Sequence, residues 1–136
     1  MEDCIFCKIV RGEIPAKKIY EDQDYLAFLN IAPNTKGHSL VIPKKHSDLF
    51  VDLSSEEVGA LNQVVQKVAK ELTLVLETKS FNLGLNNGEL SGQSINHVHW
   101  HIIPRYQGDG LLHWEKSPQA EADIDQVFKI LKDKIK

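Results

Sequence analysis

The sequence predicts a single α+β domain, residues 1–136, in which an antiparallel sheet is covered on one side by two main helices. Three observations support this fold class. The chain of 136 residues has the length of one compact domain. Short apolar segments of strand-like composition come in pairs separated by short polar turns, as in antiparallel sheets. A segment with helical spacing of apolar residues follows each group of strands.

The first half of the chain holds three predicted strands. Residues 18–21 and 25–29 are apolar segments separated by a polar turn. A loop over residues 32–37 leads into a third strand at residues 38–42, and Pro43 ends it.

The clearest helix signal begins at Ser54. This residue is a suitable N-cap, and Glu57 three positions later completes a capping box. Apolar residues then recur every three or four positions, at Val58, Leu61, Val65, Val68, Leu72 and Val75. The single apolar stripe predicts a core-facing helix of about six turns.

The second half repeats the pattern of strands followed by a helix. Residues 81–85 are a predicted strand, and a polar loop leads to another from Asn96 to Ile103, which stops at Pro104. A last helix is predicted near residues 122–135. The residues expected to face inward from it are Ile124, Val127, Phe128 and Leu131.

Charge and composition narrow the functional classes. The chain is 42% hydrophobic and 26% charged, with a formal net charge of -3. No strong basic field is available for wrapping nucleic acid, so we expect no nucleic-acid partner. The acidic start is unlike a signal peptide, and no stretch approaches the roughly 20 apolar residues of a membrane span. We expect a cytoplasmic protein with no membrane partner.

Three of the six histidines fall within five residues, at positions 97, 99 and 101. Alternate side chains of a strand share a face, so the three imidazoles point one way and the apolar residues between them point into the core. Such a row suits either a metal or an imidazole nucleophile. Because alternate strand residues lie roughly 7 Å apart, one ion reaches all three only if the strand bends.

The loop before this run offers donors that suit a phosphate. Asn86, Gly92, Gln93 and Ser94 supply amide, hydroxyl and backbone N–H groups. Glycine allows close approach of the backbone to a ligand, and N–H groups of a turn can form an anion nest.

The two cysteines, Cys4 and Cys7, have the spacing C-x-x-C. In a reducing compartment this spacing indicates metal or redox chemistry more than a structural disulfide. A thioredoxin-like motif lies between a strand and a helix, whereas this one opens the chain, so we favour the metal.

These features resemble the histidine triad (HIT) nucleotide-binding family. The family pattern is His-φ-His-φ-His-φ-φ, with φ apolar, and residues 97–103 match every position. Other segments that resemble the family, in the same order, are residues 4–9, 12–16, 37–46 and 92–94. The resemblance spans residues 4–106 and is greatest to the Hint branch, and within it to bacterial members that carry zinc.

The resemblance implies hydrolysis of nucleoside 5'-phosphoramidates or related conjugates. His99 would attack the α-phosphorus, and water would release the nucleoside monophosphate from a nucleotidyl-histidine. The carbonyl of His97 would hold one ring nitrogen of His99 as N–H. His101 and His38 would contact the phosphate or the scissile atom, and Ser94 would donate to the phosphate or the leaving group.

The resemblance also implies a pocket for a purine nucleotide or nucleotide conjugate. The residues that match the family's apolar base pocket are Ile5, Phe6, Ile9, Phe28 and Ile31. Further nucleotide-binding positions are Asn86, Gly92 and Gln93. Asn30 takes the position that binds the ribose hydroxyls, where many Hint proteins have aspartate. An amide can still bond a hydroxyl, but this departure leaves the base and sugar preference open.

A structural zinc site is the third implication of the resemblance. The residues that match the four ligands are Cys4, Cys7, His46 and His97. Two thiolates and two imidazoles suit a closed tetrahedral site. This assignment gives the side chain of His97 to structure and not to phosphate binding.

The resemblance implies a homodimer whose sheet continues across the two-fold axis. It gives no catalytic role to His113 or Trp114, which lie beyond the matched region. Three alternatives remain: a dinucleoside polyphosphate hydrolase, a non-enzymatic nucleotide-binding or scaffold protein, and a zinc hydrolase that uses the triad as ligands. The cysteine pair argues against the first, and intact His99, His101 and Ser94 argue against the second.

Overall fold

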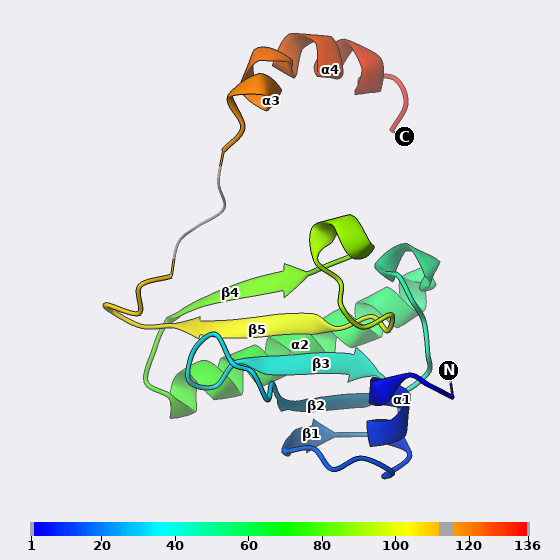
Figure 1. The fold of residues 1–136 in the computed structure, drawn as a ribbon, viewed down its shortest axis with the longest axis vertical. Coiled ribbons are helices and arrows are strands. Elements are labelled where there is room, and N and C mark those ends of the chain that lie inside the picture. The colour runs from blue at the N-terminus through cyan, green and yellow to red at the C-terminus, as the bar shows by residue number, and fades with distance from the viewer. Residues whose placement is uncertain (1, 112–115, 136) are drawn as a thin grey trace.

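A five-stranded antiparallel sheet is the centre of the fold (Figure 1). The structure is a computed structural model that describes residues 2–111 and 116–135. The strand order is β1-β2-β3-β5-β4. The strands are β1 (Lys18–Glu21), β2 (Tyr25–Leu29), β3 (Ser39–Pro43), β4 (Ser80–Leu85) and β5 (Trp100–Arg105). The predicted α+β class with an antiparallel sheet is confirmed.

Helix α2 (Ser55–Val75) covers one face of the sheet (Figure 1). The hydroxyl of Ser54 accepts the N–H of Glu57 at 3.1 Å, and the Glu57 carboxylate accepts the N–H of Ser54 at 2.8 Å. The predicted capping box is therefore confirmed. The buried residues of α2 are Leu61, Val64, Val65, Val68 and Ala69, and they pack on Ala27, Val41, Val98 and Ile102 of the sheet side.

A helix that the sequence did not predict, α1 (Ile5–Val10), lies on the opposite face. Its Phe6 and Ile9 form a second buried cluster with Leu26, Phe28, Leu40 and Ile42. Helices therefore cover both faces, not one. Six residues are too few to show an amphipathic period, so the sequence carries no periodic signal for α1.

The histidine-bearing strand is displaced from its predicted range of 96–103. Strand β5 starts at Trp100, so the first two histidines of the run, His97 and His99, precede it and His101 lies within it. The predicted alternation still holds, because Val98 and Ile102 lie in the cluster against α2. On the other face, the ring of Phe6 packs edge-on against His97 and His99.

Pro104 was expected to stop this strand but lies inside it. Pairing of β5 with β3 ends at Ile102. The N–H that proline lacks is therefore not needed for a hydrogen bond to β3 at position 104. The Pro104 carbonyl instead accepts the hydroxyl of Thr35 at 2.6 Å. On the other side β4 continues to pair as far as Arg105.

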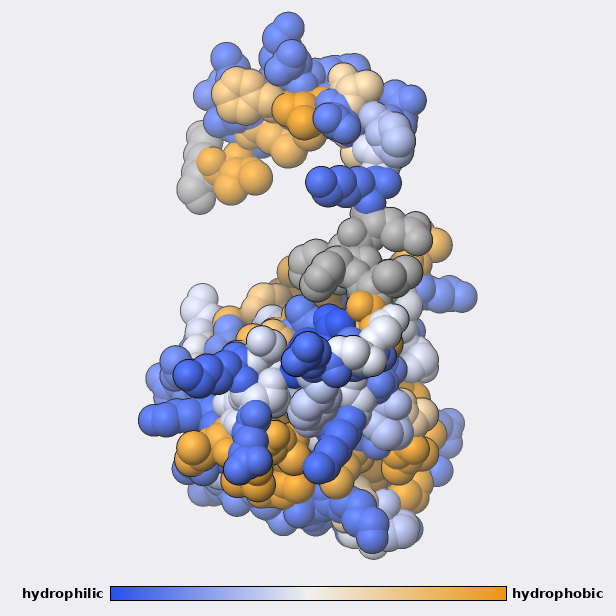
Figure 2. All heavy atoms as spheres, turned by 90° about the vertical axis from the view of Figure 1, so that its left-hand side faces the viewer, coloured by the Kyte–Doolittle hydropathy of each residue, from blue (hydrophilic) through white to orange (hydrophobic). Residues whose placement is uncertain are grey.

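The C-terminal arm, residues 116–135, carries α3 (Pro118–Ala122) and α4 (Ile124–Leu131), which lie apart from the sheet (Figure 1). The residues expected to face inward are 45–64% exposed: Ile124, Val127, Phe128 and Leu131. Figure 2 shows apolar side chains on the surface of this arm. The inward-facing prediction is wrong for the single chain, because spacing reveals an apolar face but not what covers it.

Two short 3₁₀ helices, η1 (Phe50–Asp52) and η2 (Glu89–Ser91), complete the described elements. Across residues 2–111 and 116–135, no helix has the length and apolar character needed to cross a membrane. His113 and Trp114 lie outside the described residues.

Candidate active site and metal cluster

A cavity of about 270 Å³ lies between α1, the end of β2 and the histidine run. Its apolar wall includes the predicted base-pocket residues Ile5, Phe6, Ile9, Phe28 and Ile31. Its polar residues are Asn30, Ser94, His99 and His101. Nine of the predicted site residues thus line one cavity. Asn86, Gly92, Gln93 and His38 are not among the described residues that line it.

His99 is held in a single orientation at this cavity. Its Nδ1 lies 2.7 Å from the carbonyl oxygen of His97. A carbonyl only accepts, so Nδ1 carries the proton and Nε2 carries the lone pair. Nε2 has no hydrogen-bond partner among the described residues, and no fully buried side-chain nitrogen or oxygen there lacks one. Nε2 is therefore not fully buried, and it is the ring nitrogen open to the cavity that His99 lines. Burial lowers the pKa of His99 although the bond to His97 opposes it, which keeps the ring neutral.

His101 and His38 form a hydrogen-bonded pair next to His99. His38 Nε2 and His101 Nδ1 are 2.9 Å apart, and the rings of His99 and His101 are 4.9 Å apart between centroids. Burial lowers the pKa of His38 and lowers that of His101 to about 4. His38 also accepts the N–H of Asn34 at Nδ1, 3.0 Å away. Both of its ring nitrogens are bonded inside the protein, and its contact with a phosphate stays a prediction.

The donor loop is arranged around the carboxamide of Gln93. This buried group accepts the N–H of Gly88 at 2.7 Å and donates to the carbonyl of Asp48 at 2.8 Å. Gly92 has φ +96°, the left-handed conformation that glycine adopts without strain. Asn86 donates to the Gly92 carbonyl at 3.4 Å. Asn86, Gly92 and Gln93 therefore shape the loop, and Ser94 is the residue that this loop places at the cavity.

The four predicted zinc ligands lie together beside the triad. The ligand atoms of Cys4, Cys7, His46 and His97 are all within 4.8 Å of one another. The sulfur–Nδ1 distances are 3.4 Å from Cys4 to His97, 3.3 Å from Cys7 to His46 and 3.6 Å from Cys7 to His97. A tetrahedral zinc ion with ordinary bond lengths separates sulfur from nitrogen by about 3.6 Å. The donor set and its spacing therefore fit zinc.

The surroundings of the cluster also suit a metal. His97 donates from Nε2 to the carbonyl of Pro43, and His46 pairs through Nε2 with the carboxylate of Asp48, both at 2.7 Å. Each bond fixes the proton on Nε2 and leaves Nδ1 free to ligate, as outer partners of metal-bound histidines do. Burial raises the pKa of the Cys7 thiol, so a thiolate there requires a neighbouring cation.

Some functional contacts had no signal in the sequence. The carbonyl of Pro43 and the N–H of Asn34 are main-chain groups. Every residue type provides the carbonyl and every type but proline the N–H, so neither contact marks the sequence. Asp48 was missed although its position two residues after His46 is a usable sign, since carboxylates often orient histidine ligands. The packing of Phe6 on His99 was hidden because α1 was not predicted.

Comparison with known proteins agrees with this geometry. The HIT domain model matches residues 11–108. The adenosine 5'-monophosphoramidase hnt1 of Schizosaccharomyces pombe is 41% identical over 135 residues, which cover 98% of each chain. A crystal structure of a HIT family member from Bacillus subtilis superposes with a TM-score of 0.86 at 39% identity, covering 98% of each chain. A zinc-bound histidine triad protein from Mycobacterium smegmatis gives a TM-score of 0.77 at 34% identity, covering 95% of this chain and 98% of that one.

Proposed function

The chain belongs to the HIT domain family, and from this premise we propose that it hydrolyses nucleoside 5'-phosphoramidates through a nucleotidyl group on His99. One observation carries the proposal. The bond from Nδ1 to the His97 carbonyl leaves the Nε2 lone pair of a neutral imidazole at a cavity with an apolar wall. A relative that shares 41% of its residues is named an adenosine 5'-monophosphoramidase, which supports a hydrolase.

The proposed reaction has two displacements at phosphorus. Nε2 of His99 donates its electron pair to the α-phosphorus, and the phosphorus–nitrogen bond of the substrate breaks. The leaving amine takes a proton, for which we assign the hydroxyl of Ser94, the residue of the donor loop that lines the cavity. The ring becomes cationic, which strengthens its Nδ1–H bond to the His97 carbonyl. Water then attacks the phosphorus and the bond to Nε2 breaks. One proton of the water restores the Ser94 hydroxyl, and nucleoside monophosphate leaves as the other proton passes to solvent.

The cavity wall supports binding of the nucleoside part. Stacking and burial against Phe6, Phe28 and the neighbouring isoleucines suit a purine base. The Asn30 side-chain oxygen accepts the N–H of Ala32 at 2.9 Å, so its amide nitrogen remains as the donor to a ribose hydroxyl. This assignment accommodates the departure from aspartate. The homodimer, the purine preference, the cytoplasmic location and the lack of nucleic-acid partners stay predictions.

We further propose that the four-residue cluster binds a structural zinc ion. Four protein ligands close a tetrahedral site, so the ion would supply no open position for substrate. It would hold α1, through Cys4 and Cys7, against the segment after β3 that carries His46. The comparison with a zinc-bound family member supports this assignment. The cluster itself disfavours a zinc hydrolase in which His99 ligates the metal, because its four ligands do not include His99.

The test is release of AMP from an adenosine 5'-phosphoramidate of a primary amine. We expect turnover by the wild type and a loss of about 10³-fold or more in His99→Ala. Mass spectrometry of wild type quenched during turnover should show one added nucleotidyl group, absent from His99→Ala. Diadenosine tetraphosphate serves as the competing substrate, and faster cleavage of it would favour the dinucleoside polyphosphate hydrolase. Folded wild type that binds AMP but turns over neither substrate would refute the enzyme and favour a binding or scaffold protein.

A further inference from the structure

We propose that the backbone N–H of Asn34 sets the tautomers of both His38 and His101, so that His101 presents an N–H to the cavity. Asn34 is then a positioning residue that acts through its main chain and through two imidazoles. The effect on turnover rests on the proposed function, whereas the tautomers themselves do not.

The first step is the bond from Asn34 to His38. The amide nitrogen of Asn34 lies 3.0 Å from His38 Nδ1. A peptide N–H only donates, so Nδ1 must carry a lone pair. A neutral imidazole has one N–H, and in His38 it therefore resides on Nε2. His38 is 3% exposed, and its burial favours this neutral form.

The second step passes the constraint to His101. The Nε2–H of His38 points at Nδ1 of His101, 2.9 Å away. Nδ1 of His101 must then accept, and the single proton of that ring resides on Nε2. The amide nitrogen of Asn30 lies 3.5 Å from His38 Nε2. That contact is too long, and of the wrong polarity, to compete for the His38 proton.

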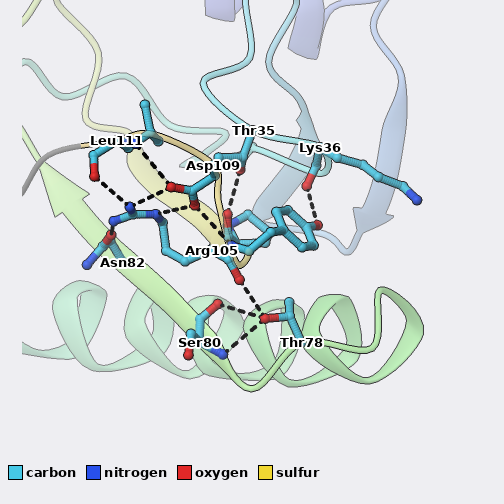
Figure 3. Close-up of polar contacts among 10 residues, drawn as sticks. Thr35, Lys36, Thr78, Ser80, Asn82, Arg105, Asp109 and Leu111 are labelled. Atoms are coloured by element: carbon cyan, nitrogen blue, oxygen red, sulfur yellow. Dashed lines mark hydrogen bonds and ion pairs between the residues drawn. The ribbon is translucent and has the colours of Figure 1, made fainter.

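The turn that carries Asn34 is anchored to the sheet at two points. Thr35 donates its hydroxyl to the Pro104 carbonyl at 2.6 Å, and the Tyr106 hydroxyl donates to the Lys36 carbonyl at 2.6 Å. In Figure 3, Thr35 and Lys36 of the turn are each hydrogen-bonded to the chain at or just beyond the end of β5. The N–H of His38 also donates to the Thr35 carbonyl at 3.1 Å. The amide of Asn34 therefore has a fixed direction relative to the strand that carries His101.

The two histidines at the cavity then have opposite roles. His99 is held with its lone pair on Nε2, whereas His101 is held with its proton on Nε2. The described lining of the cavity contains no lysine or arginine. A fixed N–H beside the nucleophile is therefore a main source of stabilisation for charge that develops on a phosphoryl oxygen. If the hydrogen bond between His38 and His101 ran the other way, Nε2 of His101 would carry a lone pair and would repel that oxygen.

The test compares Asn34→Pro, which removes the N–H, with Asn34→Ala, which keeps it. The Asn34 side chain is exposed, so Asn34→Ala isolates the backbone. Long-range ¹H–¹⁵N spectra of the histidine rings report which nitrogen carries the proton. We expect wild type and Asn34→Ala to show His38 and His101 both protonated at Nε2. Asn34→Pro should show a measurable population with the proton of His101 on Nδ1.

Protonation of His101 at Nδ1 in the wild type would overturn the proposal, as would identical ring spectra for a folded Asn34→Pro and Asn34→Ala. If Asn34→Pro does not fold, the wild type decides. Scalar couplings across the two N–H···N bonds must then link Asn34 N to His38 Nδ1 and His38 Nε2 to His101 Nδ1. Their absence refutes the proposal. Because these readouts need no substrate, they stand apart from the outcome of the phosphoramidase assay.

Discussion

Gly37, the residue before His38, gives the sharpest test of the turn that orders the candidate active site. It has φ +88°, and a Cβ built on it meets Cδ1 of Leu76 at the end of α2. Gly37→Ala therefore has two costs, one from the backbone and one from the clash. Gly12 separates them, because it has a similar φ of +78° but nothing within 4 Å of a built Cβ.

The expected magnitudes follow from these two environments. An alanine in the left-handed region costs about 1–2 kcal/mol, which is all that Gly12→Ala should lose in free energy of unfolding. Overpacking against Leu76 adds about 1–3 kcal/mol at Gly37. We therefore expect Gly37→Ala to lose about 2–5 kcal/mol in total. Part of the clash can be relieved by rotation of the Leu76 side chain, which would place the result at the lower end.

The assay is urea denaturation of both variants, of Leu76→Ala and of Gly37→Ala/Leu76→Ala. The double mutant should recover the clash term, giving a coupling energy of about 1–3 kcal/mol between the two sites. Equal losses in Gly12→Ala and Gly37→Ala, together with no coupling to Leu76, would refute the packing argument. Loss of the His38 to His101 hydrogen bond in Gly37→Ala would further show that the turn aligns the pair.

Three further perturbations test the cluster, the titration and the core. Removal of zinc by a chelator, or the substitution Cys7→Ser, should lower the melting temperature by several degrees, because a closed metal site contributes folding energy. An unchanged melting temperature on metal removal would rule out a structural ion. The pKa of His101 falls from 6.5 to about 4 on folding, so between pH 7 and pH 5 the unfolded chain binds more protons than the folded one. Up to about 2 kcal/mol of stability is therefore lost as the pH drops from 7 to 5. His101→Asn should flatten that slope in urea titrations, and equal slopes would contradict it. Phe6→Ala should lose about 3–5 kcal/mol in free energy of unfolding, and it should also slow turnover because Phe6 packs on His99. Phe6→Leu should lose about 1.5 kcal/mol or less. Similar losses for the two variants would argue against a packing role.

Much of the fold was predictable because its signals are local. The polar turn between β1 and β2 and the capping box at Ser54 mark boundaries that the structure reproduces. The start of β5 at Trp100 was not predictable from local pattern, since residues 97–99 pair with no strand of the sheet. The N–H of Val98, for example, pairs with the carbonyl of Ser47 and not with a strand. The prediction that the apolar face of α4 is buried failed for a different reason. Amphipathic spacing identifies an apolar face but not the surface that covers it.

The site was predictable as a set of residues but not as a set of orientations. Alternation placed three imidazoles on one face, and the cavity and cluster contain most of the residues that the family resemblance implied. Which ring nitrogen of His99 or His101 carries a proton depends on main-chain atoms of His97 and Asn34. Such contacts leave no mark on residue identity. Gln93 shows the same limit, since its amide serves the loop backbone.

His97 links the proposed zinc cluster to His99, the proposed nucleophile. Its Nδ1 faces the two cysteine sulfurs, its Nε2 donates to Pro43 of β3, and its carbonyl accepts from His99. A ring restrained at both nitrogens restrains the backbone that carries the carbonyl. A displacement near 1 Å can cost roughly 10²-fold in rate even when it arises away from the chemistry. In the proposed reaction the cluster would therefore act through the direction of one carbonyl, and a ligand change that leaves the sheet intact should still move the Nδ1 bond of His99.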